Sequence, residues 1–499
     1  MSQHTIAIKY GRLRGIAGRD KSITVYRGIP YAQPPVGALR WREPRPVVPW
    51  YGIRDADHFG GICPQKSGQF MEVMPLDDYF CTEDCLYLNV FVPEKAENCP
   101  VFVWFHGGAF QGGHGSDAMF DGEEFARLGV VVVTVNYRLG IMGFFAHPEM
   151  RAESPYGGSG NFGVLDQIRS LEWVRDNIAA FGGDPGNVTI GGQSAGGGSV
   201  CNMIASPLAK GLFVRAIIES GDRSVNDPNR PHVDMESLGV ALAKKLGDGS
   251  LRSMRDLPVN RLVRMDYDAA IEYTGKTFSP WVDGAILPVD QSECLRSKQG
   301  NNVPMLVGSN LDEGSVGPRG ASYADAMMSL GEFGKKLSEA YPEGSTPRES
   351  AMLLTQMGAA QWKLRLSVWA EKRAKALSLD TWQYQFCYRS TVDGIYYPAC
   401  HSAELIYVWR SMDCYPDGIR GHLSVKVTDE ELGRITSRYW CNFISTGNPN
   451  SEGLPYWTSK RESPDSHMRL DAVCAMEPDI VDERERLFLP ELRRAFALD

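Results

Sequence analysis

The stretch that decides the fold is Val188-Thr189-Ile190-Gly191-Gly192-Gln193-Ser194-Ala195-Gly196-Gly197-Gly198. An apolar run typical of a buried strand leads into G-x-S-x-G, after which a helix is expected. Such a turn strains the serine backbone, and its glycines avoid clashes that any side chain would cause. We therefore predict that Ser194 is a nucleophile lifted above a sheet edge. The alternative is a glycine-rich turn with an incidental serine, which the partners described below disfavour.

Further apolar runs lie on both sides of this turn, at residues 101–105, 130–135, 216–219, 305–308 and 382–388. Continuous runs of this kind are typical of strands covered on both faces, as in a parallel sheet. Helical patterns at 166–181 and 237–246 lie between them. The alternation predicts an α/β fold with a mostly parallel central sheet and helices on both faces. The segment at about 320–378 has no strand-like run, so we predict a cap-like helical insertion over the carboxyl ends of the strands.

A second glycine-containing stretch, Trp104-Phe105-His106-Gly107-Gly108-Ala109-Phe110, also follows an apolar run. A tetrahedral intermediate carries negative charge on the former carbonyl oxygen, and backbone N–H groups must already point at it. We predict that the amides of Gly108, Ala109 and Ala195 form this oxyanion hole. For His106 we favour a structural role as a brace of the loop.

The general base and its acid are expected to follow the serine, because triads built on such a turn run in the order Ser, acid, His. His401 lies in a short loop after the strand at 382–388 and before a helical segment, where catalytic groups sit. We interpret the other late histidines as surface residues: His232, His422 and His467. The acid that orients His401 is Asp312 or Glu313, which both follow the run at 305–308, and composition alone does not choose between them.

Composition excludes several other classes of function. The 499 residues carry a net charge of −9, which disfavours nucleic acid and anionic lipid as partners. No apolar run approaches the roughly 18 residues of a membrane span. The first residues show no leader peptide, so a cytoplasmic protein is expected unless a leader was removed. The 11 cysteines form no zinc-like spacing, and most are expected to be buried thiols.

An ordered set of motifs resembles the type-B carboxylesterases, including cholinesterases and bacterial p-nitrobenzyl esterases. The set consists of Tyr26-Arg-Gly-Ile-Pro-Tyr-Ala-Gln-Pro-Pro-Val-Gly, Glu83-Asp-Cys-Leu-Tyr-Leu-Asn-Val, Phe105-His-Gly-Gly-Ala-Phe, Asn136-Tyr-Arg-Leu-Gly, Gly160-Asn-Phe-Gly-Val-Leu-Asp-Gln, Phe181-Gly-Gly-Asp-Pro, the Ser194 turn and Trp440-Cys-Asn-Phe. The resemblance implies one α/β-hydrolase domain over residues 2–498. It also implies Glu313 as the acid and His401 as the base.

The activity implied by the resemblance is that of a serine carboxylic ester hydrolase working through an acyl-enzyme intermediate, without cofactor or metal. Its partner would be a small or medium ester, neutral or polar, and the protein a monomer or small homo-oligomer. Two other functions stay open. Some relatives are inactive adhesion or scaffold proteins, but they lose the nucleophile or its partners. A lipase would want an apolar lid, and 320–378 is too rich in charge to favour one.

The chain departs from the family pattern near the expected substrate pocket. Gln193 stands where relatives usually have Glu, and Asp222 with Arg223 stands where acyl-pocket residues are often apolar. These three residues are therefore candidates for the substrate pocket, although Asp222 and Arg223 could also point outward. The family disulfide would join Cys63 and Cys85, with Cys81 as a competitor, and the loop between them has no Trp to hold a quaternary ammonium.

Overall fold

The computed structural model describes residues 4–65, 80–221, 234–264, 278–289, 294, 298–313, 322–392, 395–414 and 427–495. The chain forms two compact units. The N-terminal unit comprises Met1–Ser224, Pro228–Val303 and Ile444–Thr446, and the C-terminal unit comprises Val225–Asp227, Pro304–Phe443 and Gly447–Asp499.

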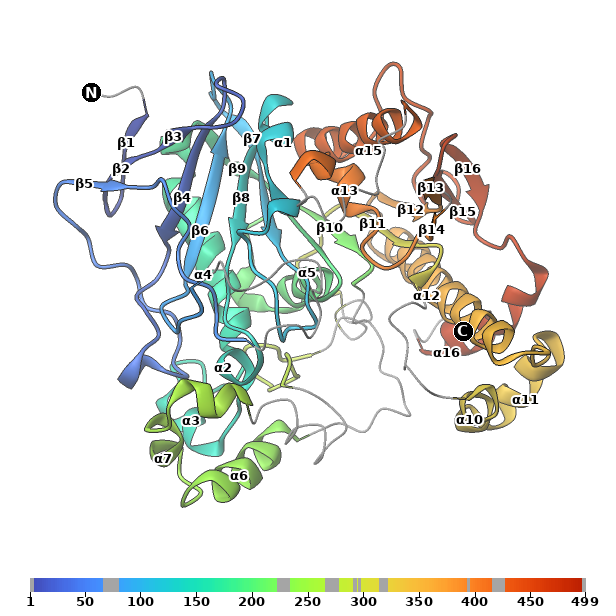
Figure 1. Ribbon diagram of the computed structural model, residues 1–499, viewed down its shortest axis with the longest axis horizontal. Coiled ribbons are helices and arrows are strands. Elements are labelled where there is room, and N and C mark those ends of the chain that lie inside the picture. Colours follow the sequence, from blue (N-terminus) through green and yellow to red (C-terminus); the bar gives the residue numbers. More distant parts are fainter. Residues whose placement is uncertain are drawn as a thin grey trace. The chain divides into compact units, whose positions relative to one another are not determined.

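The N-terminal unit is built on seven strands of a large sheet (Figure 1). Their order is β10 (Arg215–Glu219), β9 (Gly183–Gln193), β7 (Cys99–Phe105), β8 (Val131–Val135), β6 (Tyr87–Val92), β4 (Thr24–Pro30) and β3 (Ile16–Ala17). The first four strands are mutually parallel, and the other three continue the sheet in antiparallel pairs. Every residue of β8 is buried. The predicted strands are therefore confirmed, whereas the antiparallel strands at the N-terminus were not foreseen.

Helices cover both faces of this sheet, as expected. The chain crosses from β7 to β8 through α1 (Glu123–Arg127), and from β8 to β9 through α4 (Phe162–Asn177). These two crossovers run in opposite directions, because β8 and β9 lie on opposite sides of β7. Right-handed crossovers in opposite directions place their helices on opposite faces.

The remaining elements of the N-terminal unit are a small sheet and several helices. The sheet contains β1 (Thr5–Ile8), β2 (Gly11–Arg14) and β5 (Ile53–Asp55), and the helices are α2 (Gly140–Phe144), α3 (Pro148–Glu153), α5 (Ala195–Ala205), α6 (Met235–Leu246) and α7 (Leu251–Arg255).

A buried ion pair joins two of the family-like motifs. Arg138 donates from Nη2 to Asp166 Oδ1 at 2.7 Å and from Nε to Asp166 Oδ2 at 2.8 Å. This bidentate geometry fixes the start of α4 beside the end of β8.

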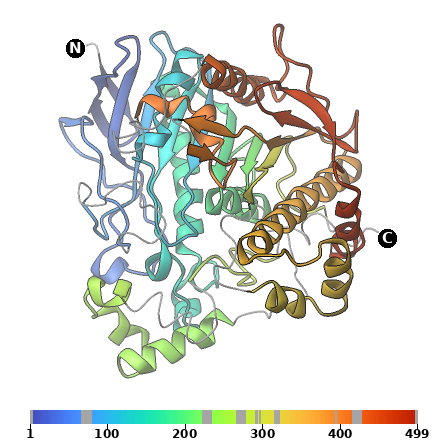
Figure 2. The same cartoon turned by 45° about the vertical axis from the view of Figure 1, so that its right-hand side comes forward.

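The C-terminal unit contains the parallel strands β11 (Met305–Asn310), β12 (Thr381–Phe386) and β15 (Ser466–Leu470), with β16 (Ala475–Pro478) antiparallel to β15. The segment between β11 and β12 is helical, as predicted, with α10 (Tyr323–Ser329), α11 (Gly331–Ala340) and α12 (Pro347–Leu377). The long helix α12 packs along β11 and β12 (Figure 2). The cap-like role expected of this segment stays a prediction. The other elements are β13 (Ser390–Val392), β14 (Ile395–Tyr397), α13 (Leu405–Val408), α15 (Val427–Thr446), the 3₁₀ helix η8 (Glu483–Phe488) and α16 (Leu489–Ala495).

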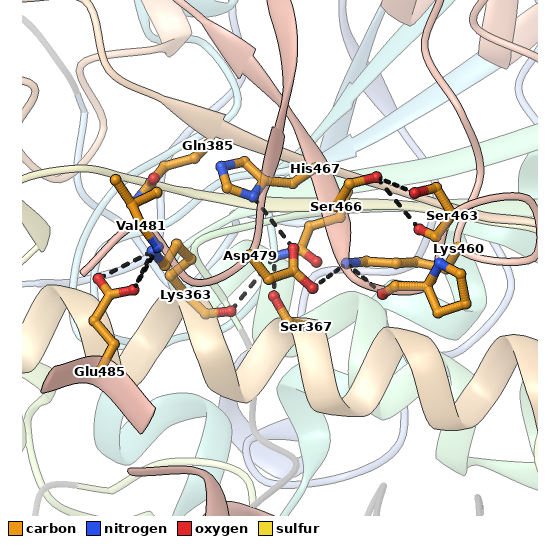
Figure 3. A network of polar contacts seen from close by, with 12 residues as sticks. Lys363, Ser367, Gln385, Lys460, Ser463, Ser466, His467, Asp479, Val481 and Glu485 are labelled. Carbon is orange, nitrogen blue, oxygen red and sulfur yellow. Dashed lines mark hydrogen bonds and ion pairs between the residues drawn. The ribbon is translucent and has the colours of Figure 1, made fainter. Parts of the chain in front are cut away.

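A buried ionic network connects residues 460–485 to α12 (Figure 3). Lys363 Nζ lies 2.9 Å from Glu485 Oε2, and Lys460 Nζ lies 2.6 Å from Asp479 Oδ2. Asp479 Oδ1 lies 3.2 Å from Nδ1 of His467. The expectation that His467 is a surface residue is therefore wrong, because this carboxylate, twelve residues later, lets the ring be fully buried. His232 and His422 lie outside the described residues.

Cys63 and Cys85 are free, buried thiols, and Cys81 is a free, exposed thiol. A side-chain hydrogen bond with Cys63, together with burial, raises the pKa of the Cys85 thiol. The disulfide implied by the family resemblance is thus absent from the structure. Sequence does not decide between two neighbouring thiols and a disulfide, because the redox state depends on the compartment. Within the described residues, no helix has the length and apolar character of a membrane span.

Candidate active site

Ser194 occupies the turn between β9 and α5 with φ 56° and ψ −122°. A non-glycine residue in this region of φ/ψ space is strained, as the motif predicts. The turn is closed by a hydrogen bond from the Ser194 N–H to the Glu219 carbonyl at 2.8 Å. A Cβ at Gly196 would lie 1.9 Å from the Phe105 carbonyl oxygen, so only glycine fits there. Ser194 is half-buried, whereas its neighbours Gln193 and Ala195 are buried.

The amide of Ala195 is the first of helix α5. The first N–H groups of a helix have no partner within the helix, and they form its positive end. Gly198 N–H donates to the Ser194 carbonyl at 2.9 Å, which begins the helical hydrogen bonding directly after the serine. The Ala195 amide is therefore suited to stabilise a negative charge that develops beside Ser194.

The loop that follows β7 approaches the serine turn closely. A Cβ at Gly107 would lie 2.9 Å from the Gln193 carbonyl oxygen and 3.3 Å from Ser194 Cβ. Gly108 has φ +107°, and a Cβ there would lie 2.1 Å from the Gly112 carbonyl oxygen. Ala109 is also left-handed, with φ 55°. The structure thus brings the predicted oxyanion loop and Ser194 together in the N-terminal unit.

This meeting point follows from the strand order. The sheet order reverses at β7, since β8 lies on one side of it and β9 on the other. The carboxyl ends of β7 and β9 are adjacent, with Phe105 opposite Gly192. In α/β sheets, ligands bind outside the carboxyl ends of the strands at such a reversal. The glycine loop and the serine turn are the two connections that leave these ends.

His106 braces the oxyanion loop, in agreement with the structural role we expected. Its ring stacks on Tyr137 with centroids 4.4 Å apart, and the Tyr137 hydroxyl donates to the His106 carbonyl at 2.7 Å. Burial lowers the pKa of His106 to about 3, so its ring stays neutral under ordinary conditions. A ring held in this way is poorly suited to accept a proton during catalysis.

The C-terminal unit brings Glu313 and His401 together. Nδ1 of His401 lies 2.5 Å from Glu313 Oε2, and the other carboxylate oxygen accepts the Asn310 N–H at 2.9 Å. Burial by itself lowers the pKa of His401, but the hydrogen bond and charge of Glu313 outweigh it, and the charge of Glu404 adds to them. The net result is a raised pKa. A carboxylate in this position orients the imidazole and stabilises its protonated form.

Asp312, the alternative acid, points to different partners. It forms an ion pair with Arg389, whose Nη2 lies 2.6 Å from Oδ1, and it accepts the Ala399 N–H at 2.9 Å. The Asp312 carboxylate therefore holds the loop that leads to His401, while the neighbouring Glu313 contacts the ring. The order of these two acids in the sequence did not reveal this division.

Three residues near His401 were not foreseen. Glu404 is fully buried, Asn310 donates to it through Nδ2, and the Trp362 ring lies 5.8 Å from the His401 ring. No local pattern in the sequence marks them, because each belongs to a different element. A glutamate three residues after a histidine is the one signal that a helical reading of this segment could have used.

The candidate pocket residues are only partly within the described structure. Gln193 ends β9 and is buried, while Asp222 and Arg223 lie outside the described residues. Within the described ranges, no group of three or more His, Cys, Asp and Glu side chains is arranged to hold a metal ion.

The chain is similar to known esterases over most of its length. The chain matches the carboxylesterase family over residues 2–320 and 321–484. It is 32% identical to the para-nitrobenzyl esterase of Bacillus subtilis (strain 168), over 98% of this chain and 99% of that protein. It is also 32% identical to the cocaine esterase of Homo sapiens, over 90% of this chain and 83% of that protein.

Solved structures show the same similarity. A thermophilic PNB esterase superimposes with a TM-score of 0.82 at 30% identity, covering 98% of this chain and all (100%) of that chain. A carboxylesterase of Geobacillus stearothermophilus superimposes with a TM-score of 0.81 at 31% identity, covering 97% and 100%. The α/β fold with a mostly parallel central sheet is therefore that of the carboxylesterase α/β hydrolases. The chain belongs to the carboxylesterase family and is a carboxylic ester hydrolase.

Proposed function

We propose that Ser194, His401 and Glu313 form the catalytic triad of this esterase, with the amides of Gly108, Ala109 and Ala195 as its oxyanion hole. The observation that carries the proposal is the backbone of Ser194. Its φ of 56° at a strand-to-helix turn is strain that persists only where the surrounding structure enforces it. The glycine loop packed against this turn and the Glu313–His401 hydrogen bond support the same roles.

In the first half of the reaction, the Ser194 oxygen attacks the ester carbonyl carbon and His401 accepts the hydroxyl proton. The carbonyl oxygen becomes an oxyanion, which the three amides stabilise. The intermediate then collapses, the bond to the alcohol oxygen breaks, and the His401 imidazolium returns its proton to the leaving alcohol. The product is an ester between Ser194 and the acyl group.

In the second half, a water molecule attacks the acyl carbon while His401 accepts one of its protons. Collapse of the second tetrahedral intermediate breaks the bond to Ser194, and His401 protonates the serine oxygen. The carboxylic acid leaves and the resting enzyme is restored. Throughout both halves Glu313 stays ionised and keeps His401 in one tautomer and orientation.

For the substrate, we propose small to medium esters that are neutral or polar. Family membership leaves this open, since the relatives are named for substrates as different as para-nitrobenzyl esters, cocaine and fumonisin B1. The neutral Gln193 beside the nucleophile supports the choice, because no carboxylate at that position attracts a cation. Hydrolysis of a panel with graded acyl and alcohol groups tests it, and a preference for long-chain lipid esters would contradict it.

We also propose a cytoplasmic enzyme that acts as a monomer or small homo-oligomer. Free, buried thiols such as Cys63, Cys85 and Cys387 support a reducing compartment. Cell fractionation and light scattering of the purified chain test the two parts separately.

The triad is tested by hydrolysis of p-nitrophenyl acetate by Ser194→Ala. The matched control is Ser329→Ala, an exposed serine at the end of α10. Loss of a triad serine costs on the order of 10⁶ in rate in subtilisin. We expect nearly complete loss of turnover with an unchanged melting temperature in Ser194→Ala, and wild-type activity in the control. A Ser194→Ala variant with more than a few per cent of wild-type kcat would overturn the assignment.

A further inference from the structure

A second carboxyl group is buried beside the Glu313–His401 pair. Glu404 follows His401 by three residues and stands directly before α13. It is fully buried, and Asn310 donates to its Oε2 atom through Nδ2. Its other oxygen, Oε1, is buried without a hydrogen-bond partner in the described part of the chain. A buried acid that is only half satisfied is costly, so its presence calls for a physical reason.

Asn310 links the two carboxyl groups. Its backbone N–H donates to Glu313 Oε1 at 2.9 Å, while its side-chain amide donates both to Glu404 and to the Cys400 carbonyl at 2.7 Å. One residue at the end of β11 therefore connects the loop of the acid with the loop of the histidine. These contacts fix the position of the backbone on both sides of His401.

The charges of the two acids act on each other and on His401. Burial and the charge of Glu313 raise the pKa of Glu404 to about 7, and the positive charge of protonated His401 opposes this rise. In the other direction, the charge of Glu404 contributes to the raised pKa of His401. Another titratable neighbour is the Cys400 thiol, whose pKa is raised by burial and by the charges of Glu404, Glu313 and Asp312. Asp312 itself is paired with Arg389.

We propose that Glu404 is a positioning residue for His401. Its carboxyl group, which can lose and regain a proton, supplies a second negative charge that stabilises the imidazolium. Through Asn310, Glu404 also holds the loop of His401 on the loop of Glu313. The proposal rests on the proposed triad. Glu404 would then stabilise the protonated His401 ring in addition to Glu313. Each time His401 accepts a proton from serine or water, a second anion nearby lowers the free energy of the protonated ring.

The loss of activity at low pH then depends on two coupled groups, His401 and Glu404. At low pH His401 is protonated and Glu404 is neutral. As the pH rises both lose protons, and each ionisation shifts the other, so the observed midpoints belong to the pair. An ionised Glu404 favours the imidazolium, which moves the midpoint for His401 to higher pH.

The test compares kcat/KM and kcat of wild type and Glu404→Gln from pH 5 to 9 with p-nitrophenyl acetate. Glutamine keeps the size and the acceptor for Asn310 but has no charge. The acid limb is the part of the profile in which kcat/KM falls as the pH falls. We expect it to move to lower pH by about 0.5 to 1 unit in Glu404→Gln, since nearby charges shift pKa values by this order or more. We also expect kcat on the plateau to fall about 3- to 10-fold with little change in KM, because a transition-state interaction is lost.

Two further variants separate this role from a merely structural one. Glu404→Asp keeps a carboxylate, so it should retain the wild-type acid limb while kcat falls. Asp429→Asn changes another buried acid of the same unit, which accepts the Tyr407 hydroxyl at 3.0 Å. It should lower the melting temperature and leave the acid limb unchanged.

Ser194→Ala separates failure of this inference from failure of the triad. If that variant is active, the proposed function fails. If it is inactive while Glu404→Gln has the wild-type acid limb and kcat, only the role of Glu404 fails. Should Glu404→Gln not fold, Glu404→Asp decides, because wild-type kcat in that variant overturns the proposal.

Discussion

Glu313 Oε2 lies 2.5 Å from Nδ1 of His401, although 88 residues separate them in the chain. Its neighbour Asp312 instead pairs with Arg389 and with the backbone of Ala399. These adjacent residues contact different partners where the chain leaves β11, so two acids of similar chemistry have two different tasks. One orients a ring, and the other holds the loop on which the ring is carried.

Exchange of the two acids for their amides should therefore have unequal effects. Glu313→Gln removes the charge that orients and stabilises His401, and by analogy with Asp→Asn in serine proteases kcat should fall about 10³- to 10⁴-fold. Asp312→Asn loses part of an ion pair with the half-exposed Arg389 and should cost less than about tenfold. Steady-state kinetics with p-nitrophenyl acetate measure both. Equal losses, or a larger loss at Asp312, would reverse the assignment.

The pH dependence of kcat/KM should rise on the acid side and then level off. His401 accepts a proton only when it is neutral, and its pKa is raised above the ordinary value of about 6.5. Activity is therefore lost as the pH falls through a midpoint above about 6.5, on a limb that also contains the ionisation of Glu404. Initial rates under subsaturating substrate locate the midpoint. A profile that is flat from about pH 5 to 9 would exclude a histidine base.

Choline esters should be poorer substrates than neutral esters of the same shape. A quaternary ammonium has no hydrogen-bond donor and is held by aromatic faces and nearby negative charge. Gln193 is neutral, and the described aromatic residue of the Cys63–Cys85 segment, Phe80, is largely exposed. We expect kcat/KM for 3,3-dimethylbutyl butyrate to equal or exceed that for butyrylcholine. A cation preference of tenfold, about 1.4 kcal/mol, would reveal a cation site and refute this expectation.

The stability of the protein should fall when one partner of the Lys363–Glu485 pair is removed, and it should be largely kept when both partners are removed. Lys363→Met leaves the Glu485 carboxylate buried without its cation, and breaking such a pair costs about 3–5 kcal/mol. Replacing both residues with Met removes both charges and should recover most of that stability. Thermal unfolding followed by circular dichroism compares the three proteins. If Lys363→Met has the same melting temperature as wild type, the pair does not contribute to stability.

Local sequence patterns were sufficient for the scaffold around the nucleophile. The run that ends at Gln193, the glycines around Ser194 and the periodicity of α4 depend on neighbours within a few residues, so the sequence alone identified them. The ordered motifs also sufficed to identify the family. The helix α4 begins at Phe162, four residues before the expected start, because boundaries depend on caps that periodicity does not show.

Tertiary structure decided what the buried polar groups do. Composition left Asp312 and Glu313 equivalent, and only the family resemblance implied Glu313. The sequence also made His467 a surface residue and gave Glu404 no role. Each of these depends on a partner in another element: His401 for Glu313, Asp479 for His467, and Asn310, 94 residues away, for Glu404. A charged or polar side chain is buried only where such a partner offsets the cost of leaving water. Whether that partner is near is settled when the chain folds, and no pattern of neighbouring residues records it.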